Sequence, residues 1–329
     1  MNCLCCGKSM SERCTLSEQE NQWHDKCVSH FFGTKQMPAI DISENRIENL
    51  IQRSTKQGMM VTGVQKKLSL NLTIDDYPRL TLVGYPAGYI LKPDTREYEE
   101  MPQAKFLSMM MAKAVGIKTV PFALIKSKSK DEKKEVIYAY ITKRIDRISK
   151  DNQVLKLAME DFCQLSYRLT SDKYRSSYER CGKIIDKYSS QAMLDKSEMF
   201  LRVIFTFATG NSDMHLKNFS LIERQGVREK YSLSDAYDML PVNVILPTDL
   251  DDCALTVNGK KRNIKRNDFL ILAATIGLRE KMAENIIEHV IHKEDVFLTL
   301  CENSLLSEQM KQDFSELIKR RIGLLRKSS

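Results

Sequence analysis

Residues 210–219 have the sequence Gly210-Asn211-Ser212-Asp213-Met214-His215-Leu216-Lys217-Asn218-Phe219, which gathers polar side chains in one short loop. The preceding residues, 199–208, are strongly apolar and predict a buried helix. A buried helix that ends in a cluster of Asn, Asp, His and Lys is costly to desolvate without a ligand. We therefore expect this loop to form part of a ligand-binding site.

The loop contains an Asp and an Asn five residues apart, Asp213 and Asn218. In the protein-kinase catalytic loop, an Asp and an Asn at this spacing accept the proton of the attacking hydroxyl and hold a divalent cation. The alternative is an ordinary turn, where Asp and Asn bond to their own backbone. Residues 218–222 and 229–233 predict two short strands joined by a polar turn. Such a hairpin would bring Asn218 and Asp238 to one end of a small sheet.

A glycine-punctuated turn at residues 58–65 precedes an alternating strand at residues 67–72. Such a turn can lay its backbone N–H groups over phosphates, although the local pattern alone favours an ordinary hairpin. Lys92 ends an apolar strand that starts at Gly88. Its stem can be buried while its ammonium group meets phosphates, and the alternative is a strand-end lysine in solvent.

Together, these motifs resemble the HipA-like serine/threonine kinases, the toxins of bacterial toxin–antitoxin modules, over residues 55–325. Several separate motifs in the right order are more specific than any single one. The resemblance implies an α+β, two-lobed protein-kinase-like fold with an antiparallel-sheet N-lobe and a mainly helical C-lobe. It rests on residues 63–65, 90–93, 211–219, 237–238, 240–245, 254–255, 258–261 and 268–269.

The expected chemistry is transfer of a phosphoryl group from ATP-Mg, bound between the lobes, to a Ser or Thr hydroxyl. Asp213 would deprotonate the hydroxyl and His215 would support the loop through hydrogen bonds. Lys217 would neutralise charge that develops on the γ-phosphoryl group. Asn218 and Asp238 would bind the Mg²⁺ ion.

In the N-lobe, the resemblance assigns the nucleotide contacts. Thr62, Gly63 and Val64 belong to the glycine loop, and Lys92 contacts the α- and β-phosphates. The lobe connection follows the last strand of the N-lobe, and there Ile145 would cover the adenine face. An exposed charged linker is the other interpretation of this connection.

The sequence departs from the family pattern at two places. In the short HipT-type form, the glycine loop carries serines that are autophosphorylated, and here Met60 and Thr62 occupy these positions. Thr62 retains a hydroxyl and is the expected autophosphorylation site. In the helix predicted over residues 103–115, Lys105 stands where a glutamate usually pairs with the ATP lysine. Either the activity is weak or a nearby acid substitutes, the candidates being Asp94, Glu99 and Glu100.

The first 36 residues contain two ligand pairs, Cys3-x-x-Cys6 and His24-x-x-Cys27, in the pattern of a small zinc site. Cys5 is an alternative ligand, as is Cys14. In a second interpretation, the cysteines are buried thiols and the arm docks through its aromatic side chains. We predict three segments: a Cys/His arm at 1–36, the N-lobe at 37–146 and the C-lobe at 147–329.

Further helices are expected over residues 41–57, from residue 159 at the start of the C-lobe, and over residues 268–276, 279–292 and 307–325. Residues 122–126 and 136–142 predict strands. His289 and His292 share one helical face and are expected to lie at the surface.

The composition is that of a globular protein, with 42% hydrophobic and 29% charged residues among 329. Nine cysteines without an export signal indicate a reducing cytosol, and we expect no membrane span. A net charge of +8 favours an anionic partner or a solvated basic surface.

The partners follow from the family resemblance. It implies a protein substrate, with an aminoacyl-tRNA synthetase as precedent, an antitoxin, and a small HipS-like protein. DNA contact is expected only through the antitoxin. Two alternatives stay open: a nucleotide-binding pseudokinase regulator and a zinc-bearing nucleic-acid-binding regulator.

Overall fold

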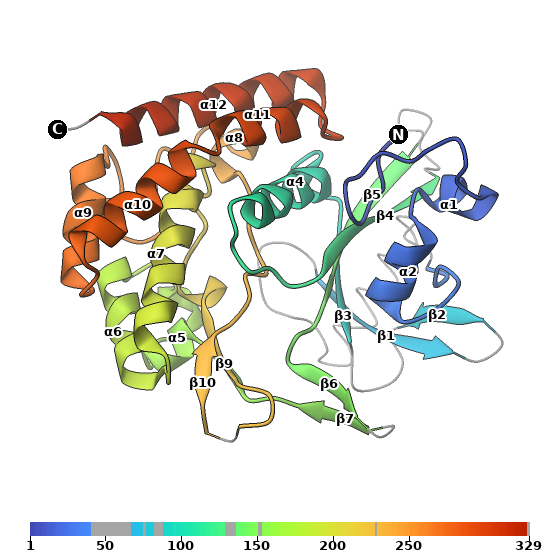
Figure 1. The fold of residues 1–329 in the computed structure, drawn as a ribbon, viewed down its shortest axis with the longest axis horizontal. Helices are drawn as coiled ribbons and strands as arrows, with labels where there is room; N and C mark the ends of the chain where they lie inside the picture. Colours follow the sequence, from blue (N-terminus) through green and yellow to red (C-terminus); the bar gives the residue numbers. More distant parts are fainter. Residues whose placement is uncertain are drawn as a thin grey trace. The chain divides into compact units, whose positions relative to one another are not determined.

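The computed structural model describes residues 1–40, 67–74, 77–81, 88–95, 97–128, 136–150, 153–227 and 229–327 (Figure 1). The chain forms two compact units. The first contains Met1–Phe106 and Val120–Val154, and the second contains Leu107–Thr119 and Leu155–Ser329. The helix predicted over residues 41–57 and the glycine loop with Met60, Thr62, Gly63 and Val64 lie outside the described residues.

A five-stranded antiparallel sheet in the order β2-β1-β3-β5-β4 forms the centre of the first unit. Leu91 and Ile141, which are register partners across β3 and β5, are fully buried, as is Leu124 on the opposite face. The strands expected at residues 67–72, 88–93, 122–126 and 136–142 are confirmed. The observed bounds are β1 (Leu68–Ile74), β2 (Pro78–Thr81), β3 (Tyr89–Pro93), β4 (Phe122–Lys128) and β5 (Val136–Lys143).

Helix α4 (Met101–Ala114) follows the third strand and confirms the helix expected over residues 103–115. Within the first unit, its Phe106 packs edge-on against Phe122 of β4, with ring centroids 5.5 Å apart. In the second unit, Met109 and Met111 are fully buried. The chain then passes from β5 through the hairpin β6 (Arg147–Lys150) and β7 (Gln153–Lys156).

The N-terminal arm belongs to the same compact unit as the five-stranded sheet. It contains two short helices, α1 (Leu16–Asn21) and α2 (Asp25–Phe32). Thr15 begins α1 with a reciprocal capping box, in which its side chain and that of Glu18 each accept a hydrogen bond from the other's backbone N–H group.

The second unit is mainly helical and is built around α7 (Ala192–Ala208), which lies against α6 (Tyr178–Tyr188), α10 (Glu280–Ile291) and α12 (Glu308–Arg326) (Figure 1). Phe200, Val203 and Phe205 on α7 are fully buried. The helices expected over residues 199–208, 268–276, 279–292 and 307–325 are confirmed. The remaining helices are α5 (Phe162–Leu165), α8 (Val242–Ile245), α9 (Arg266–Thr275) and α11 (Glu294–Glu302).

A three-stranded sheet in the order β10-β9-β8 lies within the helical unit. Its strands are β8 (Met159–Asp161), β9 (Ser220–Glu223) and β10 (Tyr231–Leu233). The prediction of a helix from residue 159 was therefore wrong for its first three residues. They pair with β9, and the helix begins only after Asp161, which caps α5. Long-range strand pairing here overrides the local pattern.

None of the helices in the described residues is long and apolar enough to cross a membrane. His289 and His292 are exposed, as expected. The ring of His289 contacts the carbonyl oxygen of Val115 at 2.9 Å, within the same unit.

Candidate active site

Gly210 is the first residue of the loop that follows α7, and its packing fixes the start of that loop. This residue has a φ of +66°, and a Cβ atom there would lie 2.8 Å from a side-chain carbon of Leu317 on α12. The carbonyl oxygen of Gly210 accepts a hydrogen bond of 3.0 Å from the backbone N–H of Asn243. Only glycine meets both the backbone and the steric requirement without strain. The end of α7 is therefore tightly packed against the helical core.

Hydrogen bonds within the loop bring Asp213 and Asn218 together. The side-chain amide of Asn218 donates to the carbonyl oxygen of Asp213 at 2.7 Å. The backbone N–H of His215 donates to the same carbonyl at 2.8 Å, and that of Asp213 donates to the Asn211 side chain at 3.1 Å. The loop thus has the compact form that the Asp-x-x-x-x-Asn spacing requires.

The carboxylate of Asp213 is 43% exposed, so it is accessible from solvent. One of its oxygens accepts a hydrogen bond from the hydroxyl of Tyr174. The Tyr174 ring packs edge-on against His215, with centroids 4.9 Å apart. Burial and the Asp213 carboxylate raise the pKa of Tyr174, which keeps its hydroxyl protonated as a donor. Tyr174 lies in a polar, tyrosine-rich stretch at residues 167–180, and no local pattern in the sequence indicates its contact with Asp213.

His215 is buried beside Asp213, with its Nε2 atom 3.8 Å from an Asp213 carboxylate oxygen. Burial lowers the pKa of His215, and the Asp213 and Asp238 carboxylates oppose only part of this effect. The Nδ1 atom accepts a hydrogen bond of 3.2 Å from the backbone N–H of Lys217. We therefore assign the ring proton of neutral His215 to Nε2, the nitrogen on the Asp213 side.

The ammonium group of Lys217 forms an ion pair of 2.7 Å with Asp161. The other carboxylate oxygen of Asp161 caps α5 by accepting from the backbone of Gln164 at 2.9 Å. The carbonyl oxygen of Lys217 accepts from the Tyr237 hydroxyl at 2.7 Å. The backbone of Lys217 is therefore held by Tyr237, and the charged end of its side chain is held by Asp161.

The predicted hairpin is present as β9 and β10, and it returns the chain from Asn218 to Asp238. Ser232 pairs with Ile222, and the backbone N–H of Ser234 donates to the Ser220 carbonyl at 2.8 Å. Asp238 is close enough to His215 to influence its pKa. The five side chains predicted to act in the C-lobe therefore belong to one compact unit: Asp213, His215, Lys217, Asn218 and Asp238.

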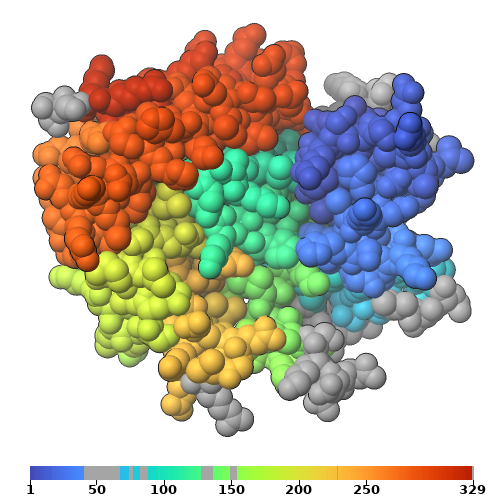
Figure 2. Space-filling view, viewed as in Figure 1, coloured from blue at the N-terminus to red at the C-terminus, as the bar shows by residue number. Residues whose placement is uncertain are grey.

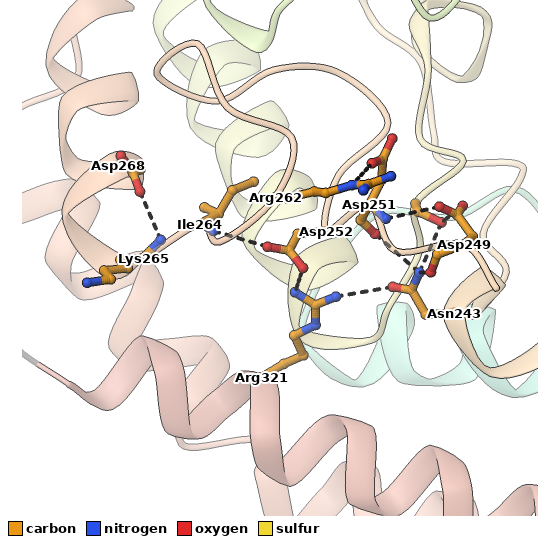
Figure 3. A network of polar contacts seen from close by, with 10 residues as sticks. Asn243, Asp249, Asp251, Asp252, Arg262, Ile264, Lys265, Asp268 and Arg321 are labelled. Atoms are coloured by element: carbon orange, nitrogen blue, oxygen red, sulfur yellow. Dashed lines mark hydrogen bonds and ion pairs between the residues drawn. The ribbon is translucent and has the colours of Figure 1, made fainter. Parts of the chain in front are cut away.

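A polar network lies behind the loop (Figure 3). The hydroxyl of Ser212 donates to Asp249 at 2.7 Å, and the side-chain amide of Asn243 donates to the Asp249 carbonyl at 2.9 Å. Arg321 of α12 is buried and forms an ion pair with Asp252. It also donates to Asn243 at 3.3 Å. These contacts anchor the residue next to Asp213 to the helical core.

In the first unit, Lys92 lies on β3 and is only 4% exposed, so the interpretation as a solvent lysine was wrong. Its ammonium nitrogen lies 5.7 Å from the centroid of the Tyr140 ring. The two residues are register partners across β3 and β5. Lys105 on α4 is also buried. The side chains of Lys92 and Lys105 therefore both lie inside the first unit, and the ring face of Tyr140 offers a favourable contact to the Lys92 ammonium group.

The turn between β5 and β6 contains Ile145, which is half-buried. The neighbouring Asp146 is buried and accepts hydrogen bonds from Arg144 and Arg147 at 2.8 and 2.5 Å. Burial acts to raise the pKa of Asp146, but the two guanidinium groups outweigh it and the pKa is lowered. The turn is an ordered, ion-paired element rather than an exposed charged linker. The adenine contact of Ile145 stays a prediction.

An antiparallel sheet with a buried lysine and a helical unit with an Asp-x-x-x-x-Asn loop together define a kinase-like fold. The HipA toxin of Shewanella oneidensis, solved with HipB and operator DNA, shares it. The TM-score is 0.67 at 18% identity, over 85% of this chain and 71% of that one. The proinflammatory kinase CtkA of Helicobacter pylori is similar at a TM-score of 0.51 and 14% identity, over 80% of this chain and 92% of that one.

The family model of the HipA-like C-terminal domain matches residues 59–296, and the chain belongs to this family. A Haemophilus influenzae protein named "Putative kinase" is 28% identical over 59% of this chain and 55% of its own length. "Putative kinase Y4dM" of Sinorhizobium fredii is 26% identical over 71% of this chain and 57% of its own length. The chain thus spans about half the length of these relatives. The resemblance predicted from the motifs is confirmed.

Proposed function

We propose that the protein is an ATP- and Mg-dependent serine/threonine protein kinase. The observation that carries this proposal is the ordered loop at the end of α7. It holds Asp213, His215, Lys217 and Asn218 together, and Asp238 lies at the end of the adjoining hairpin. This is the arrangement that phosphoryl transfer uses for proton acceptance and cation binding.

Asp213 accepts the proton of the substrate hydroxyl in this mechanism. Support comes from Tyr174, whose hydroxyl already donates to the Asp213 carboxylate. This contact supports the proposal, because it shows that a hydroxyl group can donate to the Asp213 carboxylate. His215 is neutral and orients the loop, since its Nδ1 atom accepts from the Lys217 backbone. Lys217, held by Asp161, balances negative charge near the transferred phosphoryl group.

The residues fit a magnesium ion by the chemistry of their donor atoms. Asn218 offers an amide oxygen and Asp238 a carboxylate, and both are the hard oxygen ligands that Mg²⁺ prefers. Mg²⁺ commonly binds proteins through few side chains and completes its shell with water and substrate phosphates. Asn218 and Asp238 would hold the ion, which would supply positive charge to offset the charge of the phosphates. In the first unit, Lys92 would contact the phosphates, and Thr62, Gly63, Val64 and Ile145 would complete the nucleotide site.

The biological role that we propose is that of the toxin in a HipA/HipT-type toxin–antitoxin module. Family membership supports this role, as does the fold shared with a HipA that was solved with HipB and operator DNA. The proposed target is an aminoacyl-tRNA synthetase in the cytosol, and Thr62 is the proposed autophosphorylation site. We expect an antitoxin and a small HipS-like protein as partners.

Phosphoproteomics after induced expression of the wild type and of Asp213→Asn tests this role. The proposal predicts new phosphoserine or phosphothreonine sites on one or a few proteins with the wild type alone. Identical phosphoproteomes from the two strains would contradict it. A second candidate function is a nucleotide-binding pseudokinase, because Lys105 is a buried cation where the family pattern has an acid. It predicts nucleotide binding without any transfer.

A further inference from the structure

The N-terminal arm contains a group of four potential metal ligands, Cys3, Cys6, His24 and Cys27, whose ligand atoms all lie within 4.8 Å of one another. The Cys6 sulfur lies 3.5 Å from Nδ1 of His24, and the Cys27 sulfur lies 3.9 Å from the same nitrogen. In a tetrahedral zinc site, the bond lengths to sulfur and nitrogen imply a sulfur–nitrogen separation of about 3.6 Å. The observed separations therefore fit ligands that share one ion.

The backbone builds this group from two separate turns. In the first turn, the N–H of Cys3 donates to the Lys8 carbonyl at 2.8 Å, and the N–H of Gly7 donates to the Cys3 carbonyl at 2.9 Å. Gly7 has a φ of +70°, which turns the chain sharply after the second cysteine. The other pair lies at the start of α2, where the N–H of Cys27 donates to the His24 carbonyl at 2.8 Å. Both ligand pairs thus have defined positions.

The composition of the group selects the metal. Three thiolates and one imidazole are the ligand set of structural zinc sites, and a full set of four leaves no open coordination position for catalysis. Cys5 and Cys14, the alternative ligands, are not members of the group. Within the described part of the chain, no other set of three or more His, Cys, Asp or Glu side chains gathers in this way.

The arm covers the free edge of the five-stranded sheet. Strand β4 is at one end of the sheet order. The N–H of Leu124 on this strand donates to the Leu4 carbonyl at 2.9 Å, and its carbonyl accepts from the indole N–H of Trp23 at 2.9 Å. Leu4 lies next to Cys3, and Trp23 precedes His24. The residues that satisfy the edge strand are therefore neighbours of the metal ligands.

Aromatic packing adds to this contact. Trp23 lies 5.5 Å, between ring centroids, from both Phe31 and Phe32, and Phe32 lies 5.5 Å from Tyr89 of β3. The arm forms one contiguous block in the space-filling view (Figure 2). Aromatic docking of the arm is thus present, but it involves neither His24 nor the cysteines. It leaves their convergence unexplained.

We propose that Cys3, Cys6, His24 and Cys27 bind one zinc ion, which fastens the arm to the edge strand β4. The ion links the turn at residues 3–8 to the start of α2, so that Leu4 and Trp23 stay in register with Leu124. An uncovered edge strand exposes unpaired N–H and C=O groups to other chains. The zinc is therefore structural, and it protects the sheet that carries Lys92. The arm precedes residues 59–296, so this site is independent of the matched family domain.

The test uses the full-length protein and three readouts. The first is the zinc content of the wild type, of Cys6→Ser and of the matched control Cys14→Ser. The second is the visible spectrum after cobalt substitution, which reports tetrahedral thiolate coordination. The third is the emission of Trp23, the only tryptophan in the chain and 1% exposed, before and after removal of zinc with a chelator.

We expect about one zinc per chain in the wild type and in Cys14→Ser, and loss of most of the metal in Cys6→Ser. The cobalt form should show intense sulfur-to-cobalt charge-transfer bands. Chelation should move the Trp23 emission to longer wavelength as the indole becomes exposed. Wild-type protein that binds neither zinc nor cobalt would overturn the proposal, as would equal metal content in the two variants. Metal removal without any change in Trp23 emission would overturn the fastening role.

Discussion

The substitution Gly210→Ala tests how tightly the end of α7 is packed. Gly210 has a φ of +66°, and an added Cβ atom would lie 2.8 and 2.9 Å from the two methyl carbons of Leu317. The left-handed backbone costs alanine about 1 kcal/mol, and overpacking of a filled core costs about 2 kcal/mol more. We therefore expect Gly210→Ala to lower the free energy of unfolding by about 3 kcal/mol.

A matched control separates the two contributions. Gly226 has a φ of +78°, and a Cβ atom there would meet nothing within 4 Å. Gly226→Ala should therefore cost only the backbone contribution of about 1 kcal/mol. In a Leu317→Ala background, the cost of Gly210→Ala should also fall to about 1 kcal/mol, because the obstructing side chain is gone.

The measurement is urea unfolding of the four variants, monitored by circular dichroism because most of the helices lie in the same unit as Gly210. Equal costs for Gly210→Ala and Gly226→Ala would refute the packing argument. An unchanged cost of Gly210→Ala in the Leu317→Ala background would refute it as well. Either result would mean that the loop at residues 210–219 is not anchored through this contact.

Three further predictions concern Asp238, Tyr174 and His215. Asp238→Ala should raise the Kd for ATP by at least about tenfold with Mg²⁺ present and leave it unchanged without Mg²⁺. If the variant and the wild type bind ATP equally well with Mg²⁺ and also without it, Asp238 is not a cation ligand. Tyr174→Phe removes a hydrogen bond to the partly exposed Asp213 carboxylate, which is worth about 1 kcal/mol. If this contact competes with the substrate hydroxyl, the rate of phosphoryl transfer should rise about fivefold. A lower rate would show instead that Tyr174 supports catalysis. Burial lowers the pKa of His215 from its ordinary value of 6.5, so the unfolded chain takes up a proton before the folded one, and the free energy of unfolding should fall as pH drops through 6.5. His215→Gln should flatten this dependence in unfolding curves measured between about pH 5 and 8. An unchanged slope would contradict the assignment.

Local pattern and spacing were enough to predict the elements that carry the loop. The apolar run before Gly210 predicts α7, and the alternating residues on either side of a polar turn predict β9 and β10. The apolar strand that ends in Lys92 is β3, with the lysine side chain buried. In each case, the signal lies within a short stretch of sequence, where the periodicity of apolar residues is informative.

Contacts between distant parts of the chain could not be predicted in this way. Lys217 was expected to neutralise charge on the γ-phosphoryl group, and its ion-pair partner Asp161, 56 residues upstream, was not predicted. Tyr174 reaches Asp213 across 39 residues, and Arg321 reaches Asp252 across 69. Pairings of this kind depend on the tertiary fold, and no local pattern encodes them. The same reason explains why residues 159–161 form a strand instead of a helix.

For the proposed zinc site, the sequence and the folded arm each contribute part of the assignment. The spacing of two ligand pairs suggested the site but left Cys5 and Cys14 as alternatives. Only the folded arm distinguishes them, because the turn at Gly7 and the start of α2 bring one specific set together.

The proposed role of Asp213 is to accept a proton during phosphoryl transfer from ATP. It is tested most directly by measuring nucleotide affinity and transfer from radiolabelled ATP on the same preparations of wild type and Asp213→Asn. We predict an unchanged Kd for Mg-ATP and a fall in transfer of about 10²- to 10⁴-fold. Transfer by Asp213→Asn at the wild-type rate would contradict the role of Asp213, and no transfer by either protein would contradict the proposed kinase activity.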